Sequence, residues 1–201
     1  KTNKISPATG TDVTLGDASD TFTIPASATL DINGTIDLTG ATKTGFPSIT
    51  TASQWRLTAD FTGNADPIAS NLEVVDTAGY GSLGSAMTES SGIFTFPSTG
   101  YWLIFANGMF AYTGASDYNQ IYIDTTVNNS TYVAAAFSSV LLRPAVGLMD
   151  SSAVAIHQFD VTDTTLCKVR FRIVLQVVAA TVKGDSSVSE TSFTFMKLGD
   201  T

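Results

Sequence analysis

The chain has 201 residues, of which 43% are hydrophobic, and a formal net charge of −8. This length accommodates one large domain, or one domain with an appendage, and the hydrophobic content excludes a chain that is disordered throughout. The acidity argues against nucleic acid and anionic membrane surfaces as partners, because both require a basic face. The single cysteine, Cys167, excludes a disulfide within the chain, and the apolar runs are too short for membrane insertion.

Residues 10–40 carry short apolar pairs at positions i and i+2, separated by Gly, Asp, Ser or Asn. The pairs are Val13/Leu15, Phe22/Ile24, Leu30/Ile32 and Ile36/Leu38. Each pair places two side chains on one face of a very short strand, which needs neighbouring strands or sister chains for stability. A flexible Thr/Gly/Ser linker is the alternative, although a solvated linker does not need alternating Ile and Leu. The pattern predicts an extended β-rich stem over residues 1–52 that attaches the rest of the chain to other proteins.

Residues 53–201 contain about ten further strand candidates, separated by Gly, Pro, Asn and Asp. They cover residues 55–61, 72–75, 93–96, 101–112, 120–127, 131–137, 140–142, 154–161, 166–181 and 191–198. Many strands joined by short turns are typical of a sandwich or a barrel. The sequence therefore predicts an all-β protein with one head domain over residues 53–201.

The segment 101–112 is apolar on both faces of its predicted strand. We select the large side chains of both faces as candidates for a trimer interface: Tyr101, Trp102, Leu103, Phe105, Phe110 and Tyr112. One face can form the sandwich core, and the other then needs a cover. A sister subunit is the economical cover, and a loop of the same chain is the alternative.

Two stretches of the head resemble the C1q/TNF-like jelly-roll family. Residues 92–104 read GIFTFPSTGYWLI, which resembles the family's paired aromatic strands around a Pro/Ser/Gly turn, and residues 192–199 read SFTFMKLG, which resembles its closing strand. The stem is similar to repeats in structural proteins of marine bacteriophages, through GTDVTLG at 10–16 and DTFTIP at 20–25. The first resemblance implies a ten-stranded jelly roll that forms homotrimers and binds proteins or glycans through loops and subunit junctions.

The residues that could carry catalysis or hold a metal form no recognisable motif. His157 lies in phase with apolar neighbours, and Cys167 lies in phase with the apolar row of its strand, so both are expected to be structural. No calcium loop is present and no cofactor is expected, although Asp117, Asp124 and Asp150 leave a calcium site open. We expect a protein that is not an enzyme.

Polar loops with one aromatic residue are the best candidates for receptor binding, because Tyr and Asn stack on and hydrogen-bond with sugars and proteins. Two segments fit, and their candidate residues are Asp117, Tyr118, Asn119, Asn128, Asn129 and Tyr132. Ordinary turns use the same residues. A basic stripe, Lys168, Arg170 and Arg172, is either a solvated strand face or paired with aspartates of the same or a neighbouring subunit.

Stem and head together predict a trimeric phage fibre protein on the virion surface. Its N-terminal segment would contact other virion proteins, and its head would bind a glycan or protein on the host surface. Two alternatives stay open: a head fibre or decoration protein on the capsid, and a tail spike that cleaves glycans with a carboxylate pair.

Overall fold

The computed structural model describes residues 21, 23–36, 49–144 and 146–201. Contacts divide the chain into two units, Lys1–Phe46 and Pro47–Thr201, and the second unit is called the head below. In the first unit, residues 23–36 contain a turn, closed by a 3.1 Å hydrogen bond from the Ala28 N–H to the Pro25 carbonyl, and no strand. The strands predicted around Ile24 and at Leu30/Ile32 are therefore not formed in a single chain, which offers them no pairing partner. Val13/Leu15, Phe22 and Leu38 lie outside the described residues.

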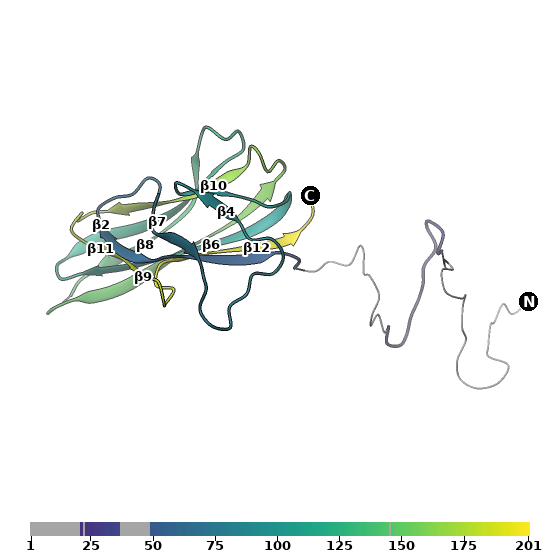
Figure 1. Cartoon of the computed structure of the whole chain (residues 1–201), viewed down its shortest axis with the longest axis horizontal. Helices are drawn as coiled ribbons and strands as arrows, with labels where there is room; N and C mark the ends of the chain where they lie inside the picture. The colour runs from purple at the N-terminus through teal and green to yellow at the C-terminus, as the bar shows by residue number, and fades with distance from the viewer. Residues whose placement is uncertain (1–20, 22, 37–48, 145) are drawn as a thin grey trace, which may run out of the picture. The chain divides into compact units, whose positions relative to one another are not determined.

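The described part of the head is built from β-strands and contains no helix (Figure 1). The strands are β1 (Ala52–Leu57), β2 (Ala59–Thr62), β3 (Leu72–Val74), β4 (Thr88–Ser90), β5 (Ile93–Thr95), β6 (Gly100–Tyr112), β7 (Ser116–Thr126), β8 (Val133–Leu142), β9 (Met149–Val161), β10 (Lys168–Leu175), β11 (Thr181–Asp185) and β12 (Ser192–Gly199). They form two antiparallel sheets, so the predicted all-β class is confirmed.

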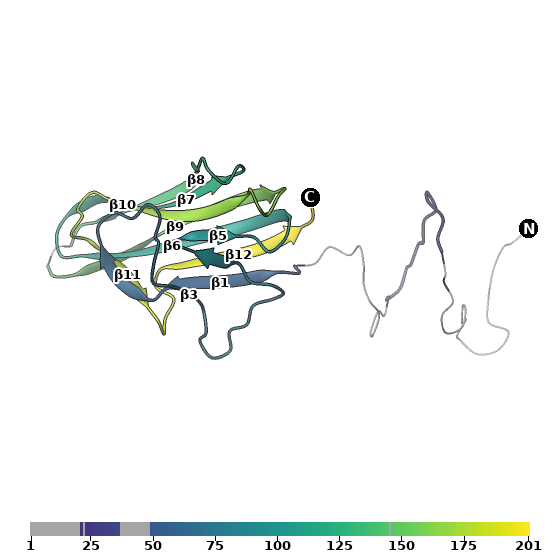
Figure 2. The ribbon, with the colours of Figure 1, turned by 45° about the horizontal axis from the view of Figure 1, so that its top comes forward.

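The two sheets differ in size and share no strand. Sheet A has seven strands in the order β2-β11-β6-β12-β1-β3, with β9 also paired to β6, and sheet B has five in the order β4-β5-β10-β7-β8. One edge of β6 pairs with β9 over its whole length, from Gly100↔Val161 to Tyr112↔Met149. The other edge pairs first with β12 and then with β11. Figure 2 shows β6 running through the sheet between these neighbours.

The core lies between the sheets and is rich in aromatic side chains. Alternation along β10 points Phe171 and Ile173 inward, and alternation along β12 does the same for Phe193 and Phe195, all of which are at most 1% exposed. The Phe171 and Phe193 rings stack at 3.9 Å between centroids, with 15° between their planes. Cys167 is also buried, at 1% exposed, as its phase predicted.

Several strand predictions needed correction. The predicted strand 55–61 divides into β1 and β2, the candidates 131–137 and 140–142 merge into β8, and β4 was not predicted. The apolar run 166–181 is not one strand: β10 ends at Leu175, and a turn closed by the Ala180 N–H on the Val177 carbonyl (2.9 Å) precedes β11. The turn contains no glycine or proline, which is why the run looked continuous. Residues 117–119 also lie within β7 rather than in a loop.

Candidate functional site

The outer face of sheet A carries a cluster of large apolar side chains that no part of the described head covers fully. This outer apolar face consists of Tyr101, Leu103 and Phe105 on β6, Val154 and Ile156 on β9, and Met196 on β12. Strand register makes them neighbours, because Phe105 pairs with Ile156 and Leu103 pairs with Met196. Ile156 is 53% exposed, Val154 49% and Tyr101 40%. Contiguous apolar surface of this kind is typical of an interaction site.

The interface candidates on β6 fall on two different faces. Tyr101, Leu103 and Phe105 belong to the outer apolar face. Trp102 and Phe110 point the other way and are 0% exposed within one chain, so their proposed contact with a second chain is wrong. Tyr112 is half-buried and packs against the same core. Alternation showed that β6 has two apolar faces, but only the position of sheet B shows which of them is the core.

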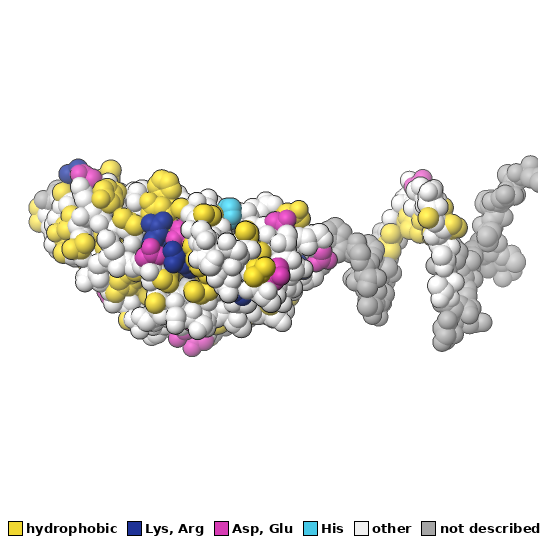
Figure 3. Space-filling model, turned by 90° about the horizontal axis from the view of Figure 1, so that it is seen from above, with side chains coloured by type: hydrophobic (Ala, Val, Ile, Leu, Met, Phe, Trp, Pro, Cys, Tyr) yellow, Lys and Arg dark blue, Asp and Glu magenta, His cyan; other side chains and the backbone are white. Residues whose placement is uncertain are grey.

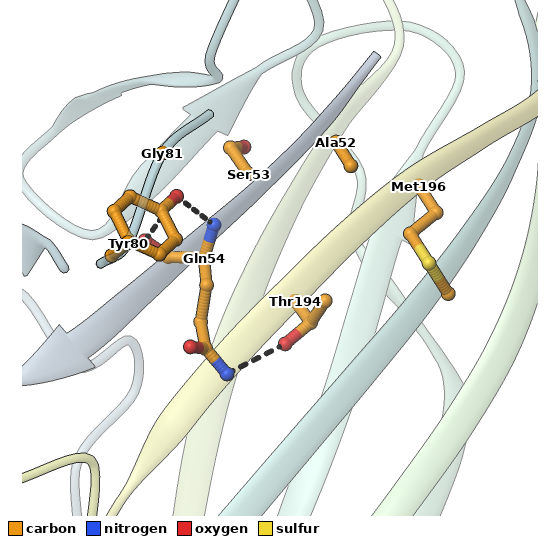
Figure 4. Close-up of a pocket in the computed structure, with 7 residues that line it drawn as sticks. All are labelled: Ala52, Ser53, Gln54, Tyr80, Gly81, Thr194 and Met196. Atoms are coloured by element: carbon orange, nitrogen blue, oxygen red, sulfur yellow. Dashed lines mark hydrogen bonds between the residues drawn. The ribbon is translucent and has the colours of Figure 1, made fainter. Parts of the chain in front are cut away.

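A shallow pocket of about 230 Å3 borders the outer apolar face on β12 and β1 (Figure 4). Tyr80 forms one wall, and its hydroxyl accepts a 2.7 Å hydrogen bond from the Gln54 N–H. The Gln54 amide donates to Thr194 Oγ1 at 3.1 Å, and Met196 lines the opposite wall. The apolar surface on β6 and β12 is therefore continuous with a concave edge.

Arg56 anchors the segment that leads to Tyr80. Its guanidinium is 0% exposed and forms ion pairs with Glu73, at 2.7 Å, and with Asp76. Burial alone would lower the pKa of Arg56, but the hydrogen bond and charge of Glu73 and the charge of Asp76 raise it overall. Arg56 therefore stays protonated, and its ion pairs hold residues 73–77 against the sheet.

The two arginines of the predicted basic stripe lie on the outer face of sheet B and pair with aspartates of the same chain, whereas Lys168 Nζ donates to the Thr164 carbonyl at 2.6 Å. Asp124 is 4% exposed and accepts hydrogen bonds from Arg172 Nε at 3.0 Å and Arg172 Nη2 at 3.2 Å. Arg170 Nη2 lies 2.9 Å from Asp66 Oδ1 and 3.5 Å from Asp124 Oδ2. The hydrogen bonds that Arg172 donates to Asp124 raise the pKa of the Arg172 guanidinium. Figure 3 shows basic and acidic side chains in contact near the middle of one face, with hydrophobic side chains around them.

The first receptor-binding segment is partly structural. Asn119 is 0% exposed; its amide donates to the Val140 carbonyl at 3.2 Å and its Oδ1 accepts from Ser116 Oγ at 3.1 Å. A side chain bound inside the fold does not contact a receptor, so this prediction is wrong for Asn119. Tyr118 is 40% exposed, and the exposed Asp117 is paired with Arg143.

The second receptor-binding segment also uses its side chains internally. Asn128 Oδ1 accepts hydrogen bonds from the N–H groups of Ser130 (3.0 Å) and Thr131 (2.8 Å), which shapes the turn. Asn129 is exposed with a φ of 54°, and the Arg170 guanidinium lies 4.4 Å from the centre of the Tyr132 ring. Burial raises the pKa of Tyr132. The two segments lie at opposite ends of β7, about 30 Å apart at 3.3 Å per residue, and do not form one site.

The acidic residues that left a calcium site open do not converge. Asp117 and Asp124 are separated by about 23 Å of strand, and Asp124 is occupied by two arginines. Asp150 lies on β9, opposite Ala111. Within the residues that the structure describes, no group of three or more His, Cys, Asp and Glu side chains could hold a metal ion.

A larger pocket, which the sequence did not indicate, lies within residues 61–71. Its volume is about 370 Å3, and its lining is Phe61, Asn64, Ala65, Asp66, Pro67, Ile68, Ala69, Ser70 and Asn71. Phe61 lies in β2, and the other lining residues form a connection that crosses to sheet B, where Ala65 pairs with Ile173. The only feature of the sequence at this position is a loop that contains Asn, Asp and Ser, and these residues are common in turns of every kind.

Solved structures of similar fold exist, although no protein-family model and no curated protein sequence matches this chain. Murine APRIL, crystallised at pH 5.0, matches with a TM-score of 0.53 and 10% identity over 74% of this chain and 98% of APRIL. Eiger TNF from S. frugiperda matches with a TM-score of 0.54 and 11% identity over 78% of this chain and 96% of Eiger. The head has a TNF-like jelly-roll fold. The predicted jelly roll is thereby confirmed, although the described head has twelve strands where the resemblance implied ten. Identities this low show the fold alone.

Proposed function

We propose that this protein is a homotrimeric fibre protein of a bacteriophage virion, whose head attaches to a host surface component. The observation that carries the proposal is the outer apolar face, which a single chain leaves half-exposed across β9, β6 and β12. TNF-like folds commonly form homotrimers, and three copies that meet through this face would cover it.

The energetics favour such an assembly. Full burial of a large apolar side chain contributes about 1.5–3 kcal/mol, and each member of the outer apolar face is already partly buried, so about 1 kcal/mol remains for each. Six members therefore contribute several kcal/mol per chain before the costs of association. Aromatic and aliphatic members are mixed with few charges, which is the composition of an interface centre.

The virion context is supported by the stem. Residues 10–16 and 20–25 carry the pattern that is similar to repeats in phage structural proteins. In the described part of the stem, Leu30 and Ile36 are 59% and 55% exposed, so these side chains also need cover from another chain. Contact with sister stems or other virion proteins would provide it, and the head would then face outward.

Two measurements test the proposal. Light scattering on the full chain should return about three times the chain mass of 21.1 kDa. Gold-labelled antibody against the head should mark the virion surface in electron micrographs, and the purified trimer should bind the host strain. Folded material at the mass of one chain, or a protein absent from the particle, would refute it.

A further inference from the structure

The pocket within residues 61–71 is held rigidly by the rest of the head. The Ile68 N–H donates to the Phe171 carbonyl at 2.9 Å, and the Ile173 N–H donates to the Ala65 carbonyl at 2.8 Å. The Asn71 carbonyl accepts from the Thr58 N–H at 2.8 Å. Ile68 itself is 3% exposed and anchors the segment in the core. A pocket fixed at three backbone positions is organised before a ligand arrives, which reduces the entropic cost of binding.

The lining combines one aromatic wall with several polar groups. Phe61 is half-buried, whereas Asn64, Ser70 and Asn71 are exposed and offer hydrogen-bonding groups. Asn64 Oδ1 accepts a 2.8 Å hydrogen bond from the Leu175 N–H, which orients this amide and leaves its NH2 group to donate. The volume of about 370 Å3 lies at the lower end of the roughly 300–1,000 Å3 range of small-molecule pockets.

Charge decides between classes of ligand. Asp66 is the pocket's one ionisable side chain, and its carboxylate is held by Arg170 at 2.9 Å. Because Asp66 is paired with Arg170, the pocket offers no free charge to an ionic ligand, and the net charge of −8 further disfavours anions. An uncharged molecule with many hydroxyl groups and one apolar face matches the polar groups and the Phe61 ring together.

We infer that the 61–71 pocket binds one sugar residue of an uncharged glycan. This inference names the ligand class of the head and rests on the proposed attachment function. The pocket shares no residue with the outer apolar face, so no lining residue belongs to the surface through which the trimer is proposed to assemble. A trimer would present three copies of it, and multivalency would strengthen weak binding at each.

The test is saturation-transfer NMR on the full-length protein. The probes are the methyl glycosides of glucose, galactose, mannose and N-acetylglucosamine, with those of glucuronic acid and N-acetylneuraminic acid as the anionic arm. The main variant is Ser70→Ala/Asn71→Gly: glycine keeps the left-handed backbone at position 71, where φ is 58°. Loss of one hydrogen bond per side chain predicts binding that is about tenfold weaker or more.

The matched control is Ser27→Gly, which removes an exposed polar side chain from the same left-handed backbone region (φ 68°) in the stem. Binding of a neutral glycoside that is weakened in the main variant and unchanged in the control supports the inference. A signal from the anionic glycosides alone, or no signal from any probe, would overturn the inference. Equal signals from the main variant and the control would also overturn it. A trimer that binds host cells without any glycoside signal leaves the attachment function standing and rejects only the glycan.

Discussion

Replacing Ile156 by aspartate separates assembly from folding better than any other change on the outer apolar face. Ile156 is 53% exposed in one chain, so the substitution removes little packing from the head itself. In a trimer the same position is covered. Full burial of this side chain contributes about 1.5–3 kcal/mol, so the part that only assembly can bury corresponds to about 1 kcal/mol per chain.

The introduced charge has the larger effect. An unpaired carboxylate that loses its water costs several kcal/mol, and the proposed trimer would contain one such carboxylate in each chain. The sum over three chains is on the order of 10 kcal/mol, which is comparable to the free energy of a micromolar complex. We therefore expect folded monomers at micromolar concentration.

The assay is light scattering after size exclusion, together with circular dichroism to confirm the fold. Val178→Asp is the control, because Val178 is 61% exposed but lies in the turn between β10 and β11. It should remain a trimer. An intact trimer of Ile156→Asp, with a normal spectrum, would refute the assignment of the interface to this face.

Three further outcomes are expected. Phe110→Ala should lower the free energy of unfolding by about 3–5 kcal/mol in a urea titration, because Phe110 is 0% exposed; a loss below 1 kcal/mol would place it outside the core. Asp124→Ala should cost about 2–3 kcal/mol, since Arg170 and Arg172 lose their shared partner; unchanged stability would show that the cluster is merely solvated. Burial lowers the pKa of His157, so the unfolded chain binds the proton more readily. The contribution of neutral His157 to the free energy of unfolding is then fully present above the ordinary pKa of about 6.5 and is lost as the pH falls below it. The variant His157→Gln should therefore lose less stability than the natural sequence between pH 7.5 and 5.5.

Alternation along the chain predicted most strands of the head, but it missed β4 and did not show where neighbouring strands divide or merge. Phe171 and Ile173 point inward and Arg170 and Arg172 outward, as their order in the sequence requires. Pairing between distant strands was not encoded in any local pattern. The hydrogen-bond partner of Arg172 is Asp124, which lies on β7, 48 residues earlier in the sequence.

The functional surfaces were harder to predict for a related reason. Trp102 and Phe105 are both large and apolar, and only the position of the second sheet distinguishes a core residue from a half-exposed one. Asn119 has the composition of a loop residue, but it is buried because its amide reaches the Val140 carbonyl on β8. The 61–71 pocket depends on backbone contacts to β10, which a single sequence does not reveal.

The position of β12 has a consequence for the synthesis of the head. β12 lies between β1 and β6, and its Thr194 bonds with Gln54, which leaves the ribosome 140 residues earlier. Until β12 has been synthesised, one edge of β1 and much of one edge of β6 have no partner. Unpaired strand edges can pair with other nascent chains. Contacts of this sequence separation also slow folding. Production at low temperature, or with chaperones that shield strand edges, should therefore raise the yield of soluble protein.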